Sequence, residues 1–576
     1  MLTLLLSWVF IGWLSLVFGL MSWHGVFRLL SREQNEPVGD TPVDYTLLLG
    51  FVAITTLSSI ISIFFPLNLL TVSLFVLAGV AGTVRFYPEI ILVKQVLQTT
   101  WKSVAMPLKA AILALMAISC FAAFMDIGES DTWFYHSQAI LWIKKYAAVP
   151  GLGNIHGRFA FNSHFFISSA FFSFFLAEDR VIFPLLSFFY LVFNIRLLVN
   201  IYSSIKSQNG FSFVLNTFLF LFFAHQVFGE INGTDTDSIT TILLLYALLL
   251  FLTPNLKNTR LHWGFLLWVL VLTAATFKLS ACLAGLLVLV LFPQLFHRRN
   301  LAVFGAAAAV IILPFIVRNI LLSGYLLYPF PGIDIVDVDW KIPLHEVVYE
   351  KELVEGWAKL PDGMIDGVTF EDVPKVLQLP FGEWFSSWWP HQSLRWRGFM
   401  LINLFSVVLF LVALFKKNYR LVLLSGAILV NLLFWFFEAP EPRFGAAFLF
   451  FGAALIFALV LKPVFKIYKP SVRLFWLFAL FLLALPPLKH VVYTPWQPNL
   501  LFYPVYEAKV KTEPFQAGNF TMRIPSKEPP AKGYWCYCAP LPCTPFPKKN
   551  VVMRGKSYQD GFRCEAEKKL QPRSQK

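Results

Sequence analysis

Long apolar segments follow one another along most of this chain, and they decide what it can fold into. A helix needs about 20 apolar residues to cross the roughly 30 Å hydrocarbon core of a bilayer. The sequence contains 14 runs that approach this length, beginning near Leu2, Tyr45, Leu67, Ala105, Val181, Phe211, Ser238, Leu261, Ser280, Leu301, Phe399, Leu421, Phe444 and Arg473. It therefore predicts an all-α polytopic membrane protein with about 14 transmembrane helices.

The composition excludes an ordinary soluble protein. Hydrophobic residues make up 57% of the 576 residues and charged residues only 14%, too few to cover several water-soluble cores. Lysine and arginine outnumber aspartate and glutamate by 47 to 33, a net charge of +14. In a soluble protein this excess would suggest nucleic acid, but in a membrane protein basic residues gather in cytoplasmic loops. We therefore expect membrane lipids, and no nucleic acid, as partners.

The orientation of the spans depends on one ambiguous segment, Phe161–Ala177, which is rich in phenylalanine but also in serine and asparagine. If it does not cross, the basic residues of the short loops fall on one side of the membrane, as the positive-inside rule requires. If it crosses, the two halves of the chain contradict each other. We therefore interpret the segment as a membrane-parallel helix and place both termini outside the cytoplasm. The first run, Leu2–Trp23, has no basic residue before it and no small-residue cleavage site after it, which indicates a retained span.

This topology divides the chain into three regions. We expect N-terminal transmembrane helices in residues 1–104, a transmembrane module in residues 105–489 and an external C-terminal cap in residues 490–576. The module carries two large external loops, 126–180 and 319–398.

The cap is rich in proline and cysteine. Its cysteines are Cys536, Cys538, Cys543 and Cys564. Because an external compartment is oxidising, we expect disulfides here rather than a zinc site. Four cysteines allow three pairings, and the sequence leaves the choice open.

Acidic residues are concentrated just beyond the fourth apolar run, at Asp126, Glu129 and Asp131. Read as an α-helix, the next segment puts Asp131 on one face with aromatic and amide side chains. Such a face suits a sugar, because aromatic rings cover its C–H surface, an amide binds its hydroxyls and a carboxylate can take a proton. The expected substrate-binding residues are Tyr135, His136, Gln138 and Trp142. The alternative is that Ser130 or Asp131 only caps the helix and Trp142 belongs to the aromatic belt.

A second acidic pair, Asp235 and Asp237, lies on the same predicted side at the start of a span, and we expect both residues to bind substrate as well. Either residue is also a suitable helix N-cap. Three basic residues stand at the outer membrane boundary: Lys278, Arg318 and Arg443. A charged residue inside a span usually has a partner, and a phosphate group is one candidate. The alternatives are that Lys278 extends toward the interface and that Arg443 pairs only with nearby Glu441.

Several short motifs accompany this layout. They are Asp131-Thr132 with Tyr135-His136, Gly151-Leu152-Gly153-Asn154 with His156 and Arg158, Phe161-Asn162-Ser163, Ala439-Pro440 with Arg443-Phe444, and Pro540-Leu541-Pro542-Cys543-Thr544-Pro545. From about residue 120 onward these motifs resemble a family of bacterial multi-span membrane proteins of poorly defined function. The layout, with its first-loop acid, long external loop and soluble tail, resembles the GT-C superfamily of membrane glycosyltransferases, such as the protein O-mannosyltransferases and the aminoarabinose transferases.

The GT-C resemblance implies an inverting glycosyltransferase on the external (periplasmic) face of the bacterial cytoplasmic membrane. It implies a polyprenyl-phosphate sugar as donor and a glycan, lipid or protein as acceptor. By position the base would be Asp131, with Asp126 and Glu129 as rivals, because the superfamily often has an adjacent acid pair and this chain has spaced acids. The three basic residues would hold the donor phosphate. The sugar and a metal requirement, Mg²⁺ or Mn²⁺, are left open.

Other classes of function remain as alternatives. A lipid-linked saccharide flippase or exporter would also need many spans and basic residues, but its charges would line a path open to both sides. An O-antigen-type polymerase would rely more on loop arginines than on a first-loop acid. A non-catalytic assembly protein would tolerate the loss of Asp131. The sequence contains no Walker motif, dinucleotide fingerprint or His-Glu-x-x-His motif, so nucleotide-driven pumping and zinc proteolysis have no support.

Overall fold

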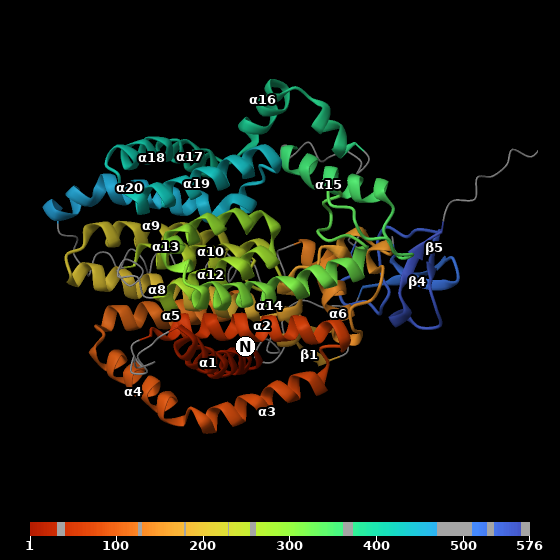
Figure 1. The fold of residues 1–576 in the computed structure, drawn as a ribbon, viewed down its shortest axis with the longest axis horizontal. Helices are drawn as coiled ribbons and strands as arrows, with labels where there is room; N and C mark the ends of the chain where they lie inside the picture. The colour runs from red at the N-terminus through yellow and green to blue at the C-terminus, as the bar shows by residue number, and fades with distance from the viewer. Residues whose placement is uncertain are drawn as a thin grey trace, which may run out of the picture.

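A computed structural model gives the fold of most of the chain (Figure 1). It describes residues 1–30, 41–124, 130–177, 180–227, 230–253, 261–360, 372–468, 510–526 and 535–565. Helices dominate these residues, as expected for an all-α membrane protein. Many of the long helices run side by side across the view of Figure 1, whereas α6, α15 and the strands β4 and β5 lie together toward one end.

The N-terminal helices pack as a tight pair flanked by a bent pair. They are α1 (Leu2–Leu30), α2 (Val43–Phe64), α3 (Leu69–Arg85), α4 (Tyr87–Ser103) and α5 (Met106–Ala122). The backbones of α1 and α2 touch, since a Cβ at Gly19 would lie 2.0 Å from the carbonyl oxygen of Thr46 and one at Gly50 would lie 1.8 Å from that of Ser15. Small residues at such crossings are typical of membrane helices.

The segment between α5 and α8 consists of short elements. They are the π-helix η2 (Thr132–His136), α6 (Ser137–Lys145), the 3₁₀ turns η3 (Leu152–Asn154) and η4 (Gly157–Ala160), α7 (His164–Phe172), and the antiparallel strands β1 (Phe174–Ala177) and β2 (Arg180–Ile182). The segment read as a membrane-parallel helix thus contains a nine-residue helix and a strand. At 1.5 Å per residue α7 is about 13 Å long, too short to cross a bilayer. All nine of its residues are buried, so the protein rather than lipid surrounds it.

A second group of helices follows. It comprises α8 (Pro184–Lys206), α9 (Gly210–Val227), α10 (Thr236–Leu252), α12 (Leu261–Phe277), η5 (Leu279–Leu291), α13 (Phe292–Leu295) and α14 (Arg298–Ser323). Among these, η5 is a 3₁₀ helix of 13 residues, although such helices rarely exceed three or four. Its buried residues include Ala281, Ala284 and Leu287, one at every third position. This spacing matches three residues per turn, so packing favours the 3₁₀ form.

The last group of helices begins within residues 319–398, the segment expected to form a long loop. They are α15 (Leu344–Lys359), η6 (Val373–Gln378), α16 (Phe381–His391), α17 (Leu394–Asn403), α18 (Phe405–Phe415), α19 (Tyr419–Glu438), η7 (Pro442–Gly445) and α20 (Ala446–Tyr468). In α16 the aromatic side chains of Trp384, Phe385 and Trp388 pack against one another and against Phe436 of α19. These aromatic contacts hold α16 against α19.

The number of spans differs from the expected count. Among the described residues, seven helices are long and apolar enough to cross a membrane, and the bent pair α3–α4, whose halves meet at 80°, would make an eighth. Five other apolar helices have 10–17 residues, at most about 26 Å in α-helical form. About 14 transmembrane helices are therefore not confirmed, because several apolar runs form helices shorter than their hydrophobic stretch suggested. The run near Arg473 lies outside the described residues.

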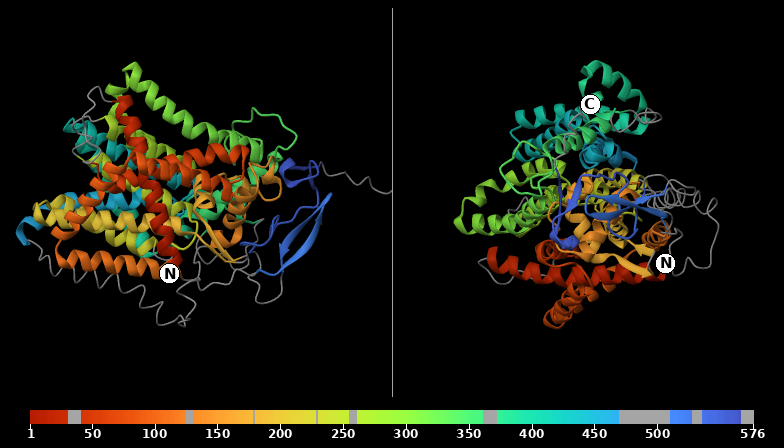
Figure 2. Two further views of the ribbon diagram at one scale, coloured as in Figure 1. Left: turned by 90° about the horizontal axis from the view of Figure 1, so that it is seen from below. Right: turned by 90° about the vertical axis from the view of Figure 1, so that its right-hand side faces the viewer.

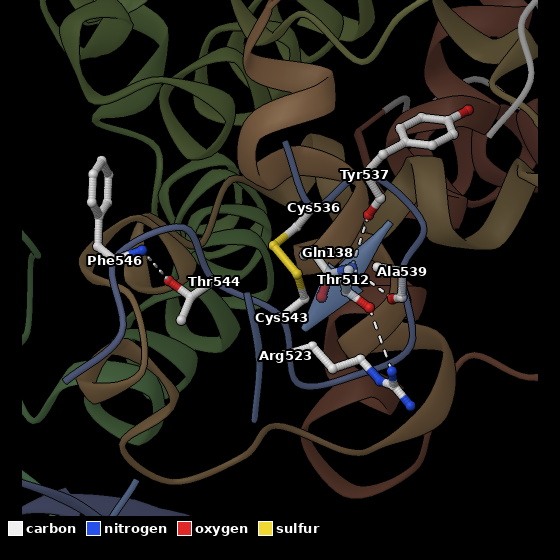
Figure 3. The surroundings of a disulfide bond; sticks show 9 residues. All are labelled: Gln138, Thr512, Arg523, Cys536, Tyr537, Ala539, Cys543, Thr544 and Phe546. Atoms are coloured by element: carbon white, nitrogen blue, oxygen red, sulfur yellow. Dashed lines mark hydrogen bonds between the residues drawn. A yellow bond between two sulfur atoms is a disulfide. The ribbon is translucent and has the colours of Figure 1, made fainter. Parts of the chain in front are cut away.

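The C-terminal region forms a small cap built from two hairpins. Strand β3 (Thr512–Ala517) pairs with β4 (Phe520–Pro525), and β5 (Val551–Met553) pairs with β6 (Phe562–Cys564). Between them, a disulfide joins Cys536 to Cys543, while Cys538 and Cys564 are free thiols (Figure 3). The left view of Figure 2 shows this region projecting from one end of the helices.

Candidate functional site

Five charged residues that are far apart in the sequence meet at the ends of several elements. Asp131 directly precedes η2, Arg158 lies in η4, Asp237 begins α10, Lys278 separates α12 from η5, and Arg443 lies in η7. Short contacts connect them into one network. The sequence expectations named four of the five, and the structure brings those four together with Arg158.

Asp131 stands between two guanidinium groups. Its Oδ1 lies 3.5 Å from Nη1 of Arg158, and its Oδ2 lies 4.0 Å from Nη1 of Arg443. The side chain makes no capping hydrogen bond to η2, which argues against a simple N-cap role. Burial acts to raise the pKa of Asp131, but the positive charges of Arg158 and Arg443 outweigh it and hold the pKa below its usual value. Asp131 is therefore ionised at neutral pH and able to accept a proton.

Arg158 is fixed from several sides. Its Nε donates a hydrogen bond of 3.2 Å to Oε1 of Glu350 in α15. Its guanidinium carbon lies 5.1 Å and 5.4 Å from the ring centroids of Phe134 and Tyr135, within range for cation–π attraction. This places Tyr135, an expected substrate residue, in contact with Arg158.

Glu350 is a site residue that sequence reasoning missed. It stood within an acidic stretch that reads as a solvated surface, yet it is only 9% exposed. The buried residues Val347 and Leu353 lie three positions before and after it on α15. A carboxylate on the apolar stripe of a helix was the available signal, since buried acids are rare unless they are paired.

On the other side of the network, Asp237 binds two cations. Nζ of Lys278 forms an ion pair with Oδ1 of Asp237, and Nε of Arg443 lies 3.7 Å from Oδ2. Nζ of Lys278 also lies 3.3 Å from the ring centroid of Phe444. Arg443 contacts Glu441 as well, at 3.8 Å. Local pairing of Arg443 with Glu441 is thus one of several contacts.

The two aspartates of the second acidic pair have different roles. Asp235 is the N-cap of α10, because its carboxylate accepts hydrogen bonds from the backbone N–H groups of Asp237 (3.1 Å) and Ser238 (2.8 Å). Asp237, in contrast, directs its carboxylate to Lys278. Of this pair, only Asp237 therefore belongs to the ion-pair network.

Glu230 lies close to this pair and was not anticipated. Its Oε2 accepts a hydrogen bond of 2.9 Å from the hydroxyl of Ser238. Burial, together with the negative charge of Asp235, raises the pKa of Glu230 to about 8. Glu230 is therefore mostly protonated at neutral pH.

Hydrogen bonds between two threonines connect η2 to the residues just before α10. The backbone N–H of Thr234 donates a 2.9 Å hydrogen bond to Oγ1 of Thr132, and the two hydroxyls lie 3.0 Å apart. Both side chains are fully buried. Because Thr132 follows Asp131 directly, these bonds fix the position of Asp131 relative to Asp237.

A cavity opens beside the network. It has about 550 Å³ of space not filled by protein atoms, part of it open to solvent, and its wall includes Asp237, Lys278 and Arg443. The rest of the wall is mostly apolar or aromatic and comes from α10, η5, α19 and α20, with Trp435 and Phe434 on α19. The wall thus combines the charged residues Asp237, Glu438, Lys278 and Arg443 with many apolar side chains, which suits a ligand that has a charged head and an apolar part.

The structure places the other expected residues elsewhere. Arg318 is buried in α14 against Ser62 and Asn162. Gln138 donates hydrogen bonds of 2.8 Å to the carbonyl oxygens of Tyr537 and Ala539 (Figure 3). Trp142 packs on Tyr558 and Phe562 of the cap. The side chains of Gln138 and Trp142 are at most 2% exposed, so the cap occupies the face that was expected to hold a sugar.

His136 is buried next to the network, and burial lowers its pKa to about 4, so it is neutral at pH 7. The rival bases Asp126 and Glu129 lie outside the described residues.

The site residues do not fit a divalent metal. Within the described ranges, no group of three or more histidine, cysteine, aspartate or glutamate side chains could hold one. Asp131 and Asp237 face arginine and lysine side chains, which compensate the negative charges of the two carboxylates in place of a metal ion.

These features define a helical protein with several helices that could cross a membrane and a partly buried network of ion pairs beside a cavity. The chain belongs to the family described as Domain of unknown function (DUF8201), whose model matches residues 1–450. No curated protein and no solved structure matches the chain.

Proposed function

We propose that this protein is a membrane glycosyltransferase of the GT-C type, which transfers a sugar from a polyprenyl-phosphate donor to a glycan, lipid or protein acceptor. One observation carries the proposal: an ionised carboxylate, Asp131, contacts Arg443, and both Arg443 and Lys278 line a largely apolar cavity. Proton acceptor and phosphate-binding cations are the two kinds of group that this transfer requires on the protein.

In the proposed reaction, the acceptor hydroxyl attacks the anomeric carbon of the donor sugar from the face opposite the phosphate. Asp131 takes the hydroxyl proton while the new C–O bond forms. The bond from the anomeric carbon to the phosphate oxygen breaks, and polyprenyl phosphate leaves with the electron pair. The configuration at the anomeric carbon is therefore inverted. General-base assistance is typically worth about 10²–10⁴ in rate.

The cations act on the leaving group. As the bond breaks, negative charge gathers on the phosphate, so fixed positive charges stabilise the transition state more than the ground state. Lys278 and Arg443 are both on the cavity wall. Their contacts with Asp237 hold them in place before the donor binds, which reduces the reorganisation needed during the reaction.

The proposal includes the arrangement in the membrane. We propose a GT-C-like bundle of about 14 spans in the bacterial cytoplasmic membrane, with both termini, the cap and the site on the external face. The contact of the cap with α6 supports this arrangement, because it puts the cap on the same side of the helices as the segment that carries Asp131. The apolar donor chain would then lie between helices.

The test is the replacement Asp131→Asn, which keeps size and most hydrogen bonding but removes the ability to accept a proton. The variant should insert normally and lose on the order of 10²-fold or more in transfer. Cells that lack the native protein and carry the variant would be scored for the surface glycan. Asp334→Asn, an exposed external carboxylate of the same type, is the matched control and should restore the glycan. A well-expressed Asp131→Asn protein that restores it fully would exclude Asp131 as the base.

A further inference from the structure

A second, smaller cavity lies apart from the proposed site. It has about 280 Å³ of space that protein atoms do not fill and shares no wall residue with the first cavity. Its wall comes from α6, η3, η4, α7 and α14. Most of the wall is apolar, from Ala139, Ile143, Leu152, Phe159, Phe166 and Leu322. The one charged residue on it is Arg318.

Arg318 is 3% exposed, and within the part of the chain that the structure describes it has no carboxylate partner. Nε donates to Oδ1 of Asn162 (3.1 Å), while Nη1 donates to the carbonyl oxygen (3.0 Å) and to the hydroxyl (2.9 Å) of Ser62. A guanidinium has five N–H donors, so three are used and the two on Nη2 remain. Buried charges are normally paired, which makes this residue an exception.

The helix α2 compensates only part of this charge. Ser62 belongs to the last turn of α2, where the unpaired carbonyl groups carry about half a negative charge in total. The nearest titratable side chain does not add a negative charge. His164 in α7 is neutral at pH 7, because burial and then the charge of Arg318 lower its pKa to about 3.

The other polar groups of the cavity are already engaged. Nδ2 of Asn162 donates to the carbonyl oxygen of Phe315 (2.9 Å), and the hydroxyl of Ser163 donates to that of Phe277 (2.8 Å). Among the side chains of the wall, the N–H groups without an acceptor in the described residues are thus the two on Nη2 of Arg318 and the second one on Nδ2 of Asn162. A phosphate or carboxylate has several oxygens that each require a donor, whereas a halide is satisfied by few contacts and tolerates apolar walls.

We infer that this cavity binds one small monovalent anion of the halide type, such as chloride, against Nη2 of Arg318. The anion balances the guanidinium and fills the space under α6, the helix that follows the segment carrying Asp131. The site is independent of the proposed sugar transfer, and its test measures binding rather than activity.

The first experiment is thermal unfolding of the purified protein in detergent, in chloride or gluconate at constant ionic strength. Chloride should raise the midpoint, and the rise should level off with concentration, because a ligand that binds only the folded state stabilises it by mass action. Arg318→Gln should abolish the chloride dependence. The matched control is Arg196→Gln, because Arg196 is a partly buried arginine whose partner is the carboxylate of Asp44. It should keep the chloride dependence even if its midpoint falls.

A second measurement keeps the inference testable if Arg318→Gln does not fold. Crystals of the unchanged protein grown with bromide should show an anomalous scattering peak within hydrogen-bonding distance of Nη2 of Arg318. Equal unfolding midpoints in chloride and gluconate, or no bromide peak at Nη2, would overturn the inference and indicate that water occupies the cavity.

Discussion

The backbone N–H of Tyr537 donates a hydrogen bond of 2.8 Å to the carbonyl oxygen of Trp133. The indole ring of Trp133 also lies 4.2 Å from the ring centroid of Tyr537 and stacks on Trp535 at 5.1 Å. Trp133 is two residues after Asp131, so the cap is attached directly to the segment that carries the proposed base. The disulfide between Cys536 and Cys543 closes the chain on which Tyr537 lies (Figure 3).

The first prediction concerns this disulfide. The double replacement Cys536→Ser and Cys543→Ser should destabilise the cap by about 2–3 kcal/mol, the value for closing a short loop. Because the cap holds Trp133, transfer should also fall, although Asp131 is unchanged. Thermal unfolding and the glycan assay would measure both effects. Cys564→Ser removes a free thiol of the cap and is the control. Native transfer by the double variant would show that the cap does not position Asp131.

Arg158 should set the pH dependence of transfer. The base must be ionised, so activity falls as the pH drops through the pKa of Asp131, which Arg158 helps to keep low. Arg158→Gln removes this charge and raises the pKa of Asp131. The acid side of the profile of kcat/KM against pH should therefore move to higher pH. Arg554→Gln, which removes a cap arginine paired with Asp339, should leave the profile in place. An unmoved acid limb in Arg158→Gln would mean that another group titrates.

Arg443 should act on the donor phosphate. Arg443→Lys keeps the charge but loses the planar fork that can bind two phosphate oxygens, whereas Arg443→Ala loses both. We expect donor use to weaken in Arg443→Lys and to weaken further in Arg443→Ala. Inhibition by free polyprenyl phosphate should weaken in the same order. If Arg443→Ala shows unchanged kinetics, Arg443 is only a structural partner of Asp237 and Glu441.

Lys278 and Asp237 should be coupled in stability. Lys278→Met leaves the buried carboxylate of Asp237, 8% exposed, with a more distant partner, and breaking a buried pair in this way typically costs about 3–5 kcal/mol. Adding Asp237→Asn should recover part of the loss. A double-mutant cycle on thermal unfolding would measure the coupling. Additive effects of the two replacements would show that the pair does not contribute as a unit.

The proposed topology can be tested by cysteine labelling in a background without free thiols. A cysteine at Lys556, which is exposed on the cap, should react with a membrane-impermeant reagent on intact cells. A cysteine at Lys416, just after α18, should react only after the cells are opened. The reverse pattern would place the cap and the site in the cytoplasm and contradict the proposed topology.

Part of the ion-pair network could be selected from the sequence, although Arg318, which was selected with it, lies elsewhere. Unpaired charges at the borders of apolar runs are rare enough that Asp131, Asp237, Lys278 and Arg443 could be selected without a structure, because charge at a membrane border needs a partner. Glu350 could not be selected in the same way, since it does not stand at the border of an apolar run and is followed directly by Lys351 and Glu352.

The face of the segment after Asp131 was not predictable from spacing. We assumed 3.6 residues per turn, but residues Thr132–His136 form a π-helix, whose wider turns change the direction of every later side chain. Gln138 and Trp142 therefore meet the cap instead of the ion-pair network. The contacts that the cap makes there come from residues about 400 positions later in the chain, and no local pattern encodes them.

The 3₁₀ helix η5 changes what the length of an apolar run means. A 3₁₀ helix rises about 2.0 Å per residue, against 1.5 Å for an α-helix. The 13 residues of η5 and the four of α13 therefore extend about 32 Å together, whereas the same 17 residues would extend about 26 Å as an α-helix. The longer value matches the hydrocarbon thickness of a bilayer. By stretching its backbone, a run that is too short by residue count gains the reach of a full span, with Lys278 at its beginning.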